Sequence, residues 1–157
     1  MTDTTLRRPP FDPELEAALA LVGDQLPSTL TPEMIPLMRQ SPVSGEEEIF
    51  AVLAERGFTL RDVTIAGHGG DEIVVSVVEK EGRTGTGPGF FHTHGGGMII
   101  GNRWLGVAGF LEWAERFNGV IVTVEYRLAP EFPDPYPVED CYAALLWTAE
   151  NAEELGI

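Results

Sequence analysis

The pattern of apolar and polar positions predicts three short helices at the start of the chain. Residues 12–22 begin with Asp-Pro, a favoured helix start, and then place apolar side chains at helical spacing. Residues 31–33 repeat such a start, and Pro36 makes the second helix short or irregular. Residues 44–47 (Ser-Gly-Glu-Glu) form a capping box that opens a third helix, which stops at Gly57.

A different pattern follows. Residues 60–66 and 72–80 are rich in β-branched side chains, and the glycine-rich segment 67–71 predicts the turn of an antiparallel hairpin between them. Residues 89–93 and 120–124 are almost continuously apolar, as in strands of a parallel sheet covered on both faces. Two further helices are predicted, at about 104–117 and 138–155. The order of elements predicts an α/β fold with a mostly parallel sheet and an amino-terminal antiparallel hairpin, preceded by helical segments.

The most informative stretch is His94-Gly95-Gly96-Gly97, which follows the strand predicted over 89–93. Consecutive glycines let the backbone approach a substrate without an intervening Cβ, and they adopt dihedral angles that other residues avoid. In an open α/β sheet, ligands bind beyond the carboxyl ends of the strands, where this turn lies. In that setting the turn is typical of the oxyanion hole of lipases and esterases. The glycine run alone is equally compatible with a flexible turn.

A second motif supports the interpretation of the glycine turn as part of an active site. Residues 126–131 read Tyr-Arg-Leu-Ala-Pro-Glu, and residues 132–137 continue as Phe-Pro-Asp-Pro-Tyr-Pro. Together with the glycine turn, this block resembles the hormone-sensitive-lipase family of α/β-hydrolases, which includes bacterial esterases and lipases. The resemblance covers the whole chain: residues 1–45 are similar to the helical cap region of the family. Residues 46–157 are similar to the first half of its catalytic domain, before the nucleophile.

The resemblance implies roles for the residues of the turn. The backbone N–H groups of Gly96 and Gly97, with Gly95 next, are expected to form the oxyanion hole. His94 is expected to orient the loop and not to act as the catalytic base. Met98 stands where the family usually has an aromatic residue, so we expect it to line a substrate pocket of less defined shape.

The second block has a structural interpretation. We expect Arg127 and Glu131 to fix the loop after the strand at 120–124 through charge-assisted hydrogen bonds. Asp140 is expected in the first turn of the last helix, where its charge suits the helix dipole.

The histidines and the cysteine do not indicate a cofactor or a metal site. His92 and His94 would place both imidazoles on one face of a strand, but no third ligand is evident, so we interpret His92 as a packed strand residue. His68 falls in a turn that is predicted to be exposed. Cys141 is the only cysteine, and we expect a small buried side chain there instead of a nucleophile.

Charge and hydropathy exclude other classes of partner. The formal net charge of −15 opposes binding to nucleic acid or to an anionic membrane surface, because both repel acidic proteins. No apolar run approaches the roughly 18–20 residues that would span a membrane. Residues 1–10 also lack the apolar segment of a secretory signal. We therefore expect a cytoplasmic protein with no membrane span.

The catalytic triad of the family is not visible. Its nucleophile is a serine in Gly-x-Ser-x-Gly, followed along the chain by an acid and then a histidine. None of the four serines stands in that frame, and no histidine follows His94; the serines are Ser28, Ser41, Ser44 and Ser76. The resemblance thus implies the amino-terminal portion of a serine carboxylesterase that hydrolyses short-chain esters through an acyl-enzyme. By itself the chain is expected to be inactive.

The expected partners follow from the same resemblance. In the strand order of the family the fifth strand lies beside the third, so a chain that stops earlier exposes the edge of a central strand. We expect a small ester as substrate, and the complementary carboxyl-terminal half of the enzyme, or an oligomer, as cover for that edge. Two alternatives remain: a non-catalytic ligand-binding protein on the same fold, and an inactive truncated product.

Overall fold

The computed structural model describes residues 9–23, 29–40 and 46–157. The chain divides into two compact units, residues 1–34 and 35–157. The functional division into a cap region up to residue 45 and a catalytic part after it stays a prediction.

The first predicted helix start is confirmed, whereas the second opens as a 3₁₀ turn, Pro32–Met34, before its α-helix begins. Helix α1 spans Pro13–Val22, and the Asp12 carboxylate accepts hydrogen bonds from the first backbone N–H groups of the helix. Helix α2 spans only Ile35–Arg39, as the proline within it predicts. Helix α3 spans Glu46–Glu55. Ser44 and Gly45 of the proposed capping box lie outside the described residues.

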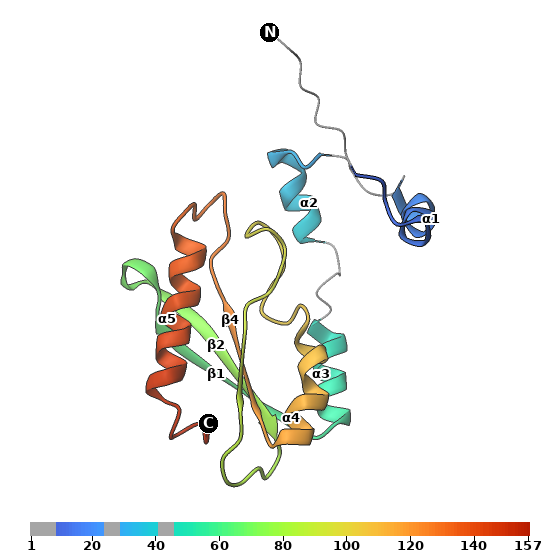
Figure 1. The fold of residues 1–157 in the computed structure, drawn as a ribbon. Coiled ribbons are helices and arrows are strands. Elements are labelled where there is room, and N and C mark those ends of the chain that lie inside the picture. The colour runs from blue at the N-terminus through green and yellow to red at the C-terminus, as the bar shows by residue number, and fades with distance from the viewer. Residues whose placement is uncertain (1–8, 24–28, 41–45) are drawn as a thin grey trace. The chain divides into compact units, whose positions relative to one another are not determined.

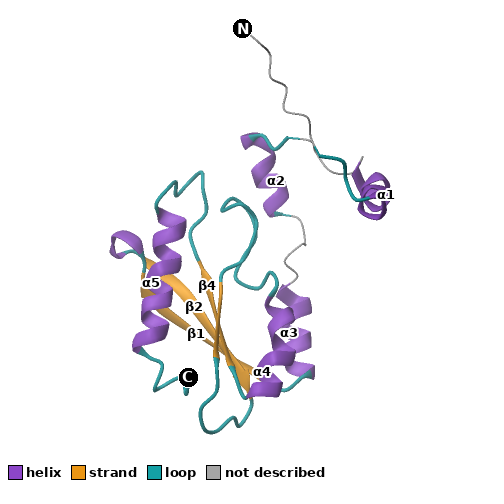
Figure 2. Ribbon diagram, in the orientation of Figure 1, coloured by secondary structure: helices purple, strands orange, loops and turns teal. Residues whose placement is uncertain are grey.

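A mixed sheet forms the centre of the second unit (Figure 2). Its strands are β1 (Phe58–Ala66), β2 (Glu72–Lys80), β3 (Gly89–His92) and β4 (Val120–Glu125), in the spatial order β1-β2-β4-β3. Strands β1 and β2 form the predicted antiparallel hairpin, and β3 and β4 run parallel. Strand β2 pairs with β4 in the antiparallel sense. Strand β3 is therefore an edge of the sheet.

Helices cover both faces of this sheet (Figure 1). Helix α5 (Tyr136–Glu150) packs on one face, over a core that includes Val75, Val122 and Ala144. Helices α3 and α4 (Leu111–Phe117) pack on the other, around Leu53 and Ile121. The predicted α/β class is confirmed, and both central strands are buried on both sides. Among the residues that the structure describes, no helix combines the length and apolarity needed to cross a bilayer.

Two helices are shorter than the sequence predicts. The segment predicted as a helix over 104–117 begins with turns and a 3₁₀ turn, Val107–Phe110, before α4 starts. Gly106 adopts a left-handed conformation with φ of 93°, which an α-helix cannot contain. The last helix ends at Glu150 instead of near residue 155, where the Asn151 side chain donates to the carbonyl of Trp147.

A row of polar side chains crosses the sheet on the face that α3 and α4 cover. Asp62, Ser76, Thr123 and His92 are direct cross-strand neighbours on β1, β2, β4 and β3. The Ser76 hydroxyl donates to Asp62 at 2.5 Å, and the Nδ1 atom of His92 lies 2.9 Å from the Thr123 hydroxyl. We call these four residues the polar row. Arg103 closes it, because its guanidinium donates to Asp62 and its carbonyl accepts from Thr123.

Candidate active site

The glycine loop, residues 94–101, leaves the carboxyl end of β3. Gly96 and Gly97 have φ values of 120° and 62°, and Met98 also has a positive φ of 62°. A Cβ atom on Gly96 would lie 2.1 Å from the carbonyl oxygen of Ile100, so no side chain fits there. Glycine is thus required at position 96 by contact as well as by conformation.

The rest of the protein holds the carbonyl groups of this loop. The carbonyls of His94, Met98 and Ile99 accept hydrogen bonds from the Tyr126 hydroxyl, the Ala129 N–H and the Arg39 guanidinium, at 2.7, 2.9 and 2.8 Å respectively. The carbonyl of Gly96 accepts from the N–H groups of Ile99 and Ile100, at 3.2 Å each. These bonds fix the orientation of successive peptide planes.

The N–H groups of the glycines are the donors that this turn can offer to a ligand. Within the described parts of the chain, those of Gly95, Gly96 and Gly97 donate no hydrogen bond. Gly95 and Gly97 are exposed and Gly96 is half-buried. A turn whose carbonyls are bound and whose adjacent N–H groups are unoccupied can accept an anionic oxygen.

His94 is held in one place and one tautomer. Its ring stacks on that of Tyr126, with centroids 4.2 Å apart, and its Nδ1 atom donates to the carbonyl of Gly95 at 2.7 Å. Burial lowers the pKa of His94, although the bond to Gly95 partly opposes this shift. The proton therefore sits on Nδ1 in a neutral imidazole. The other ring nitrogen, Nε2, could accept a proton but is buried, so His94 is poorly placed to act as a base on substrate.

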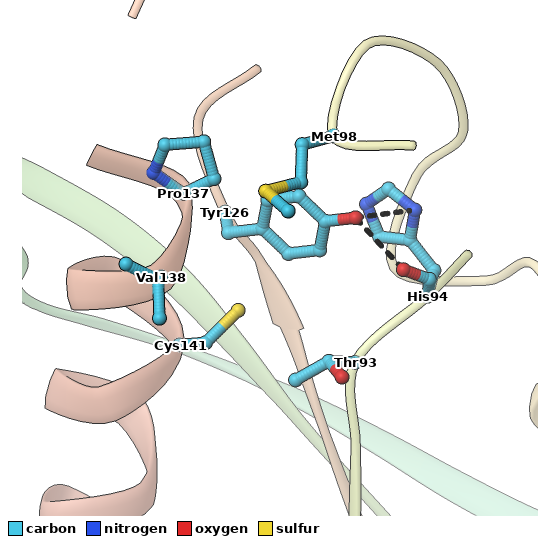
Figure 3. Close-up of a pocket in the computed structure, with 7 residues that line it drawn as sticks. All are labelled: Thr93, His94, Met98, Tyr126, Pro137, Val138 and Cys141. Carbon is cyan, nitrogen blue, oxygen red and sulfur yellow. Dashed lines mark hydrogen bonds between the residues drawn. The ribbon is translucent and has the colours of Figure 1, made fainter. Parts of the chain in front are cut away.

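Tyr126 is a matching donor for this loop. Burial, with smaller contributions from Cys141 and Glu125, raises the pKa of Tyr126 to about 12. Its hydroxyl group is therefore protonated at neutral pH and donates to the backbone of His94 (Figure 3).

A cavity of about 300 Å³ lies beside the loop. Figure 3 shows its lining: Thr93, His94, Met98, Tyr126, Pro137, Val138 and Cys141. The lining is mostly apolar, and Met98, which is 54% exposed, stands at the loop side of it. Burial, together with the nearby charge of Asp140, raises the pKa of Cys141 to about 11, so this thiol stays protonated and is a poor nucleophile.

Residues 90–157, which contain this loop and cavity, match a family model described as the alpha/beta hydrolase fold. Carboxylesterase NlhH of Mycobacterium tuberculosis is 31% identical, over 99% of this chain and 47% of that relative. An arylesterase of Saccharolobus solfataricus is 35% identical, over 55% of this chain and 28% of its own length.

Solved structures agree with these relatives. A bacterial heroin esterase superimposes with a TM-score of 0.67 at 37% identity, covering 93% of this chain and 45% of its own. Brefeldin A esterase, described as a bacterial homologue of human hormone-sensitive lipase, gives a TM-score of 0.62 at 30% identity, covering the same shares of the two chains. The chain has the α/β-hydrolase fold, and its sequence and structure are similar to those of the hormone-sensitive-lipase family. It spans about half the length of the curated relative that it matches along nearly all of its own.

In this α/β-hydrolase chain, Asp140 forms an ion pair with Arg127. The sequence analysis predicts instead that its charge interacts with the helix dipole. Asp140 is the fifth residue of α5, fully buried, and lies beyond the first helical turn. Arg127 donates to its two oxygens at 2.7 and 2.8 Å, and the N–H groups of His68 and Arg127 also donate to it. Asp140 therefore connects the loops that contain His68 and Arg127. The predicted interaction with the helix dipole is wrong, because Asp140 lies beyond the first turn.

The hydrogen bonds to Asp140 favour the charged form of its carboxyl group. Burial by itself would raise its pKa, but the bonds from Arg127 and from the two backbone N–H groups outweigh that effect and lower it. His68, expected in an exposed turn, is half-buried: its ring packs edge-on against Tyr136, and its carbonyl accepts from Arg127. The predicted charge-assisted bonds of Arg127 are confirmed.

Glu131 also forms the predicted charge-assisted bonds, and its partner is Arg39 in α2. Nothing in the sequence marked Arg39, because it is a basic residue in a short helix with no motif around it. Only the fold brings it to the glycine loop, through its bond to the Ile99 carbonyl.

His92 is the packed strand residue that the sequence predicts. It is buried, and its Nδ1 atom donates to the Thr123 hydroxyl, which itself donates to the carbonyl of Arg103. Strand β3 ends at His92, so His94 belongs to the loop and the two histidines do not share a strand face. In the described ranges, no group of three or more His, Cys, Asp or Glu side chains could hold a metal ion.

Ser76 is not placed to act as a nucleophile. It is fully buried within the polar row, and its hydroxyl is bound to Asp62. The other three serines, Ser28, Ser41 and Ser44, lie outside the described residues.

Proposed function

We propose that this chain supplies the oxyanion hole of a serine carboxylesterase that acts on short-chain esters. The observation that carries the proposal is the glycine loop, in which most carbonyls accept hydrogen bonds. Among the described residues, the N–H groups of Gly95, Gly96 and Gly97 have no acceptor. The esterase activity of the relatives supports the same reaction class.

In the proposed reaction, a serine hydroxyl attacks the ester carbonyl while a histidine takes its proton. The carbonyl oxygen becomes negative, and the N–H groups of Gly96 and Gly97, with Gly95 next, donate hydrogen bonds to it. Collapse of this intermediate expels the alcohol, and water then hydrolyses the acyl-enzyme. A bound oxyanion donor commonly contributes about 3–4 kcal/mol to the transition state.

The role proposed for His94 is to orient the loop. Its Nδ1–H group donates a hydrogen bond to the carbonyl of Gly95, and its ring is stacked on that of Tyr126. The serine, the acid and the base of the proposed triad would come from outside these 157 residues. Met98 lines the cavity beside the loop, where we propose that it contacts the substrate.

Hydrolysis of p-nitrophenyl acetate and butyrate by the full-length protein tests this function. We expect turnover, labelling by a serine-reactive phosphonate, and a loss of kcat of at least about 100-fold in Gly96→Ala. Gly109→Ala is the matched control, because a Cβ there meets nothing within 4 Å. Saturable binding of an ester without turnover or labelling would instead favour the ligand-binding alternative.

We further propose that a second polypeptide segment covers the free edge of β3. The two edges of the sheet differ: β1 carries the charged Arg61 and Asp62, which discourage strand addition, whereas β3 offers Phe90 and Phe91. The complementary half of an esterase, or a second copy of this chain, would pair there.

Native mass spectrometry of the purified protein checks this second proposal. We expect the chain to occur with its complementary segment or as an oligomer. A monomer of this polypeptide alone that unfolds cooperatively would contradict it.

A further inference from the structure

Arg39 bonds to two loops at once. Its Nε atom donates to the Ile99 carbonyl at 2.8 Å, and its Nη2 atom donates to the Ala129 carbonyl at 2.7 Å. Its Nη1 and Nη2 atoms also donate to the two carboxylate oxygens of Glu131, at 3.0 Å each. Every nitrogen of the guanidinium is therefore engaged, and helix α2 is fastened to both the glycine loop and the loop after β4.

These bonds lie where the two loops meet. The Ala129 N–H donates to the carbonyl of Met98, next to the carbonyl that Arg39 binds. Within the glycine loop, the N–H groups of Ile99 and Ile100 donate to the carbonyl of Gly96. Arg39 thus anchors the far end of a turn whose near end carries the glycine N–H groups.

The turn needs such an anchor. Gly97 and Met98 both have a φ of 62°, and a methionine adopts this left-handed conformation only at a cost. Strained residues of this kind persist when the surrounding structure over-determines them. The bonds to the carbonyls of Met98 and Ile99 supply that constraint.

We infer that Arg39 is a positioning residue for the oxyanion donors Gly96 and Gly97, so that helix α2 forms part of the catalytic apparatus. The inference rests on the proposed esterase function. The effect is geometric, because Glu131 is 56% exposed and an exposed ion pair contributes little by itself. The planar guanidinium donates to two carbonyls at once. The ammonium group of a lysine is a compact point charge and lacks this fork of donors.

The first test is kinetic and uses the full-length protein with p-nitrophenyl acetate. Arg39→Met is expected to lower kcat roughly 10- to 100-fold with little change in KM, because a misplaced donor weakens transition-state binding only. Arg39→Lys should recover little of this loss, and Glu131→Gln should have a much smaller effect. Arg56→Met is the matched control, since Arg56 forms a comparably exposed pair with Glu115 on α4.

The second test does not depend on activity. In amide hydrogen exchange, Arg39→Met should accelerate exchange at Ile99, Ile100 and Ala129 by at least about tenfold, while Arg56→Met leaves these amides unchanged. If the parent protein hydrolyses no ester, the proposed function fails, and the exchange rates alone decide whether Arg39 orders the loop. Unchanged exchange at the three amides, or an active Arg39→Met variant with an unchanged kcat, would overturn the inference.

Discussion

The hydroxyl of Tyr126 donates to the backbone carbonyl of His94 at 2.7 Å while the rings of the two residues stack. One side chain at the end of β4 thereby orients both the main chain and the imidazole at the start of the glycine loop. The stacking is apolar and the hydrogen bond is directional, so the two contributions can be separated by mutation.

Tyr126→Phe should retain the stacking and lose the hydrogen bond. We expect a loss of about 1–3 kcal/mol in the free energy of unfolding, because the buried carbonyl of His94 is left without its donor. Urea denaturation measures this change. Tyr142→Phe is the control, since Tyr142 is exposed on α5 and its replacement should change stability by less than about 0.5 kcal/mol. Equal effects of the two substitutions would show that the bond to His94 contributes nothing.

Arg127→Met should be among the most destabilising single substitutions in the chain. It leaves the Asp140 carboxylate fully buried with its main partner removed, which costs about 3–5 kcal/mol in comparable pairs. Arg61→Met, an exposed position on β1, should cost less than about 0.5 kcal/mol. A loss below about 1 kcal/mol for Arg127→Met would mean that water or relaxation solvates Asp140 in its absence.

Stability should fall as the pH drops from 7 towards 5. Burial lowers the pKa of both His92 and His94 in the folded state, so the unfolded chain binds protons first, at its ordinary value of about 6.5. The stabilisation is complete above that value and is lost as the pH falls towards the folded pKa. His92→Asn should flatten the slope of unfolding free energy against pH in this window. An unchanged slope would contradict the contribution assigned to His92.

Asp140 acts in a separate window. Its folded pKa is lowered, so its contribution is complete above the unfolded value of about 3.9 and is lost only in stronger acid. Asp140→Asn should therefore change the pH dependence of unfolding below about pH 4 and leave the slope between pH 7 and 5 as it is. A changed slope in that upper range would indicate that Asp140 is not ionised there.

Thr123→Val tests the polar row with nearly constant side-chain volume. It removes the donor to the Arg103 carbonyl and the acceptor for His92, which should cost about 1–3 kcal/mol in thermal or urea unfolding. Thr64→Val on the exposed side of β1 is the control and should stay within about 0.5 kcal/mol of the parent. A neutral result for Thr123 would imply that other groups satisfy these partners.

Local signals predicted most of the fold. The helix start at Asp12, the hairpin turn at 67–71 and the two apolar strands depend on short-range patterns, which the sequence displays directly. The helix ends were less predictable. Gly106 breaks the predicted helix through a left-handed conformation, and a lone glycine in a helical pattern does not reveal whether it will be tolerated.

In the candidate site, too, local patterns predict only what is contiguous in the sequence. The glycine loop is contiguous, so its motif is visible in the sequence, and the role given to its N–H groups stays a prediction. Arg39 and Asp140 owe their positions to contacts between segments that are far apart along the chain. No local pattern specifies such contacts. For this reason the helix-dipole interpretation of Asp140 was wrong, and the sequence carries no signal for the role of Arg39.

The hydrogen bonds of the polar row favour the observed register of the sheet, in addition to the packing of its apolar side chains. Its four members meet only when all four strands are aligned as observed, and a slip of one residue would place apolar neighbours against Asp62 and His92. Mispaired sheets therefore bury polar groups without partners and are selected against during folding. For the same reason, an apolar replacement at one buried position of the row should cost more than the same replacement made together with its cross-strand neighbour.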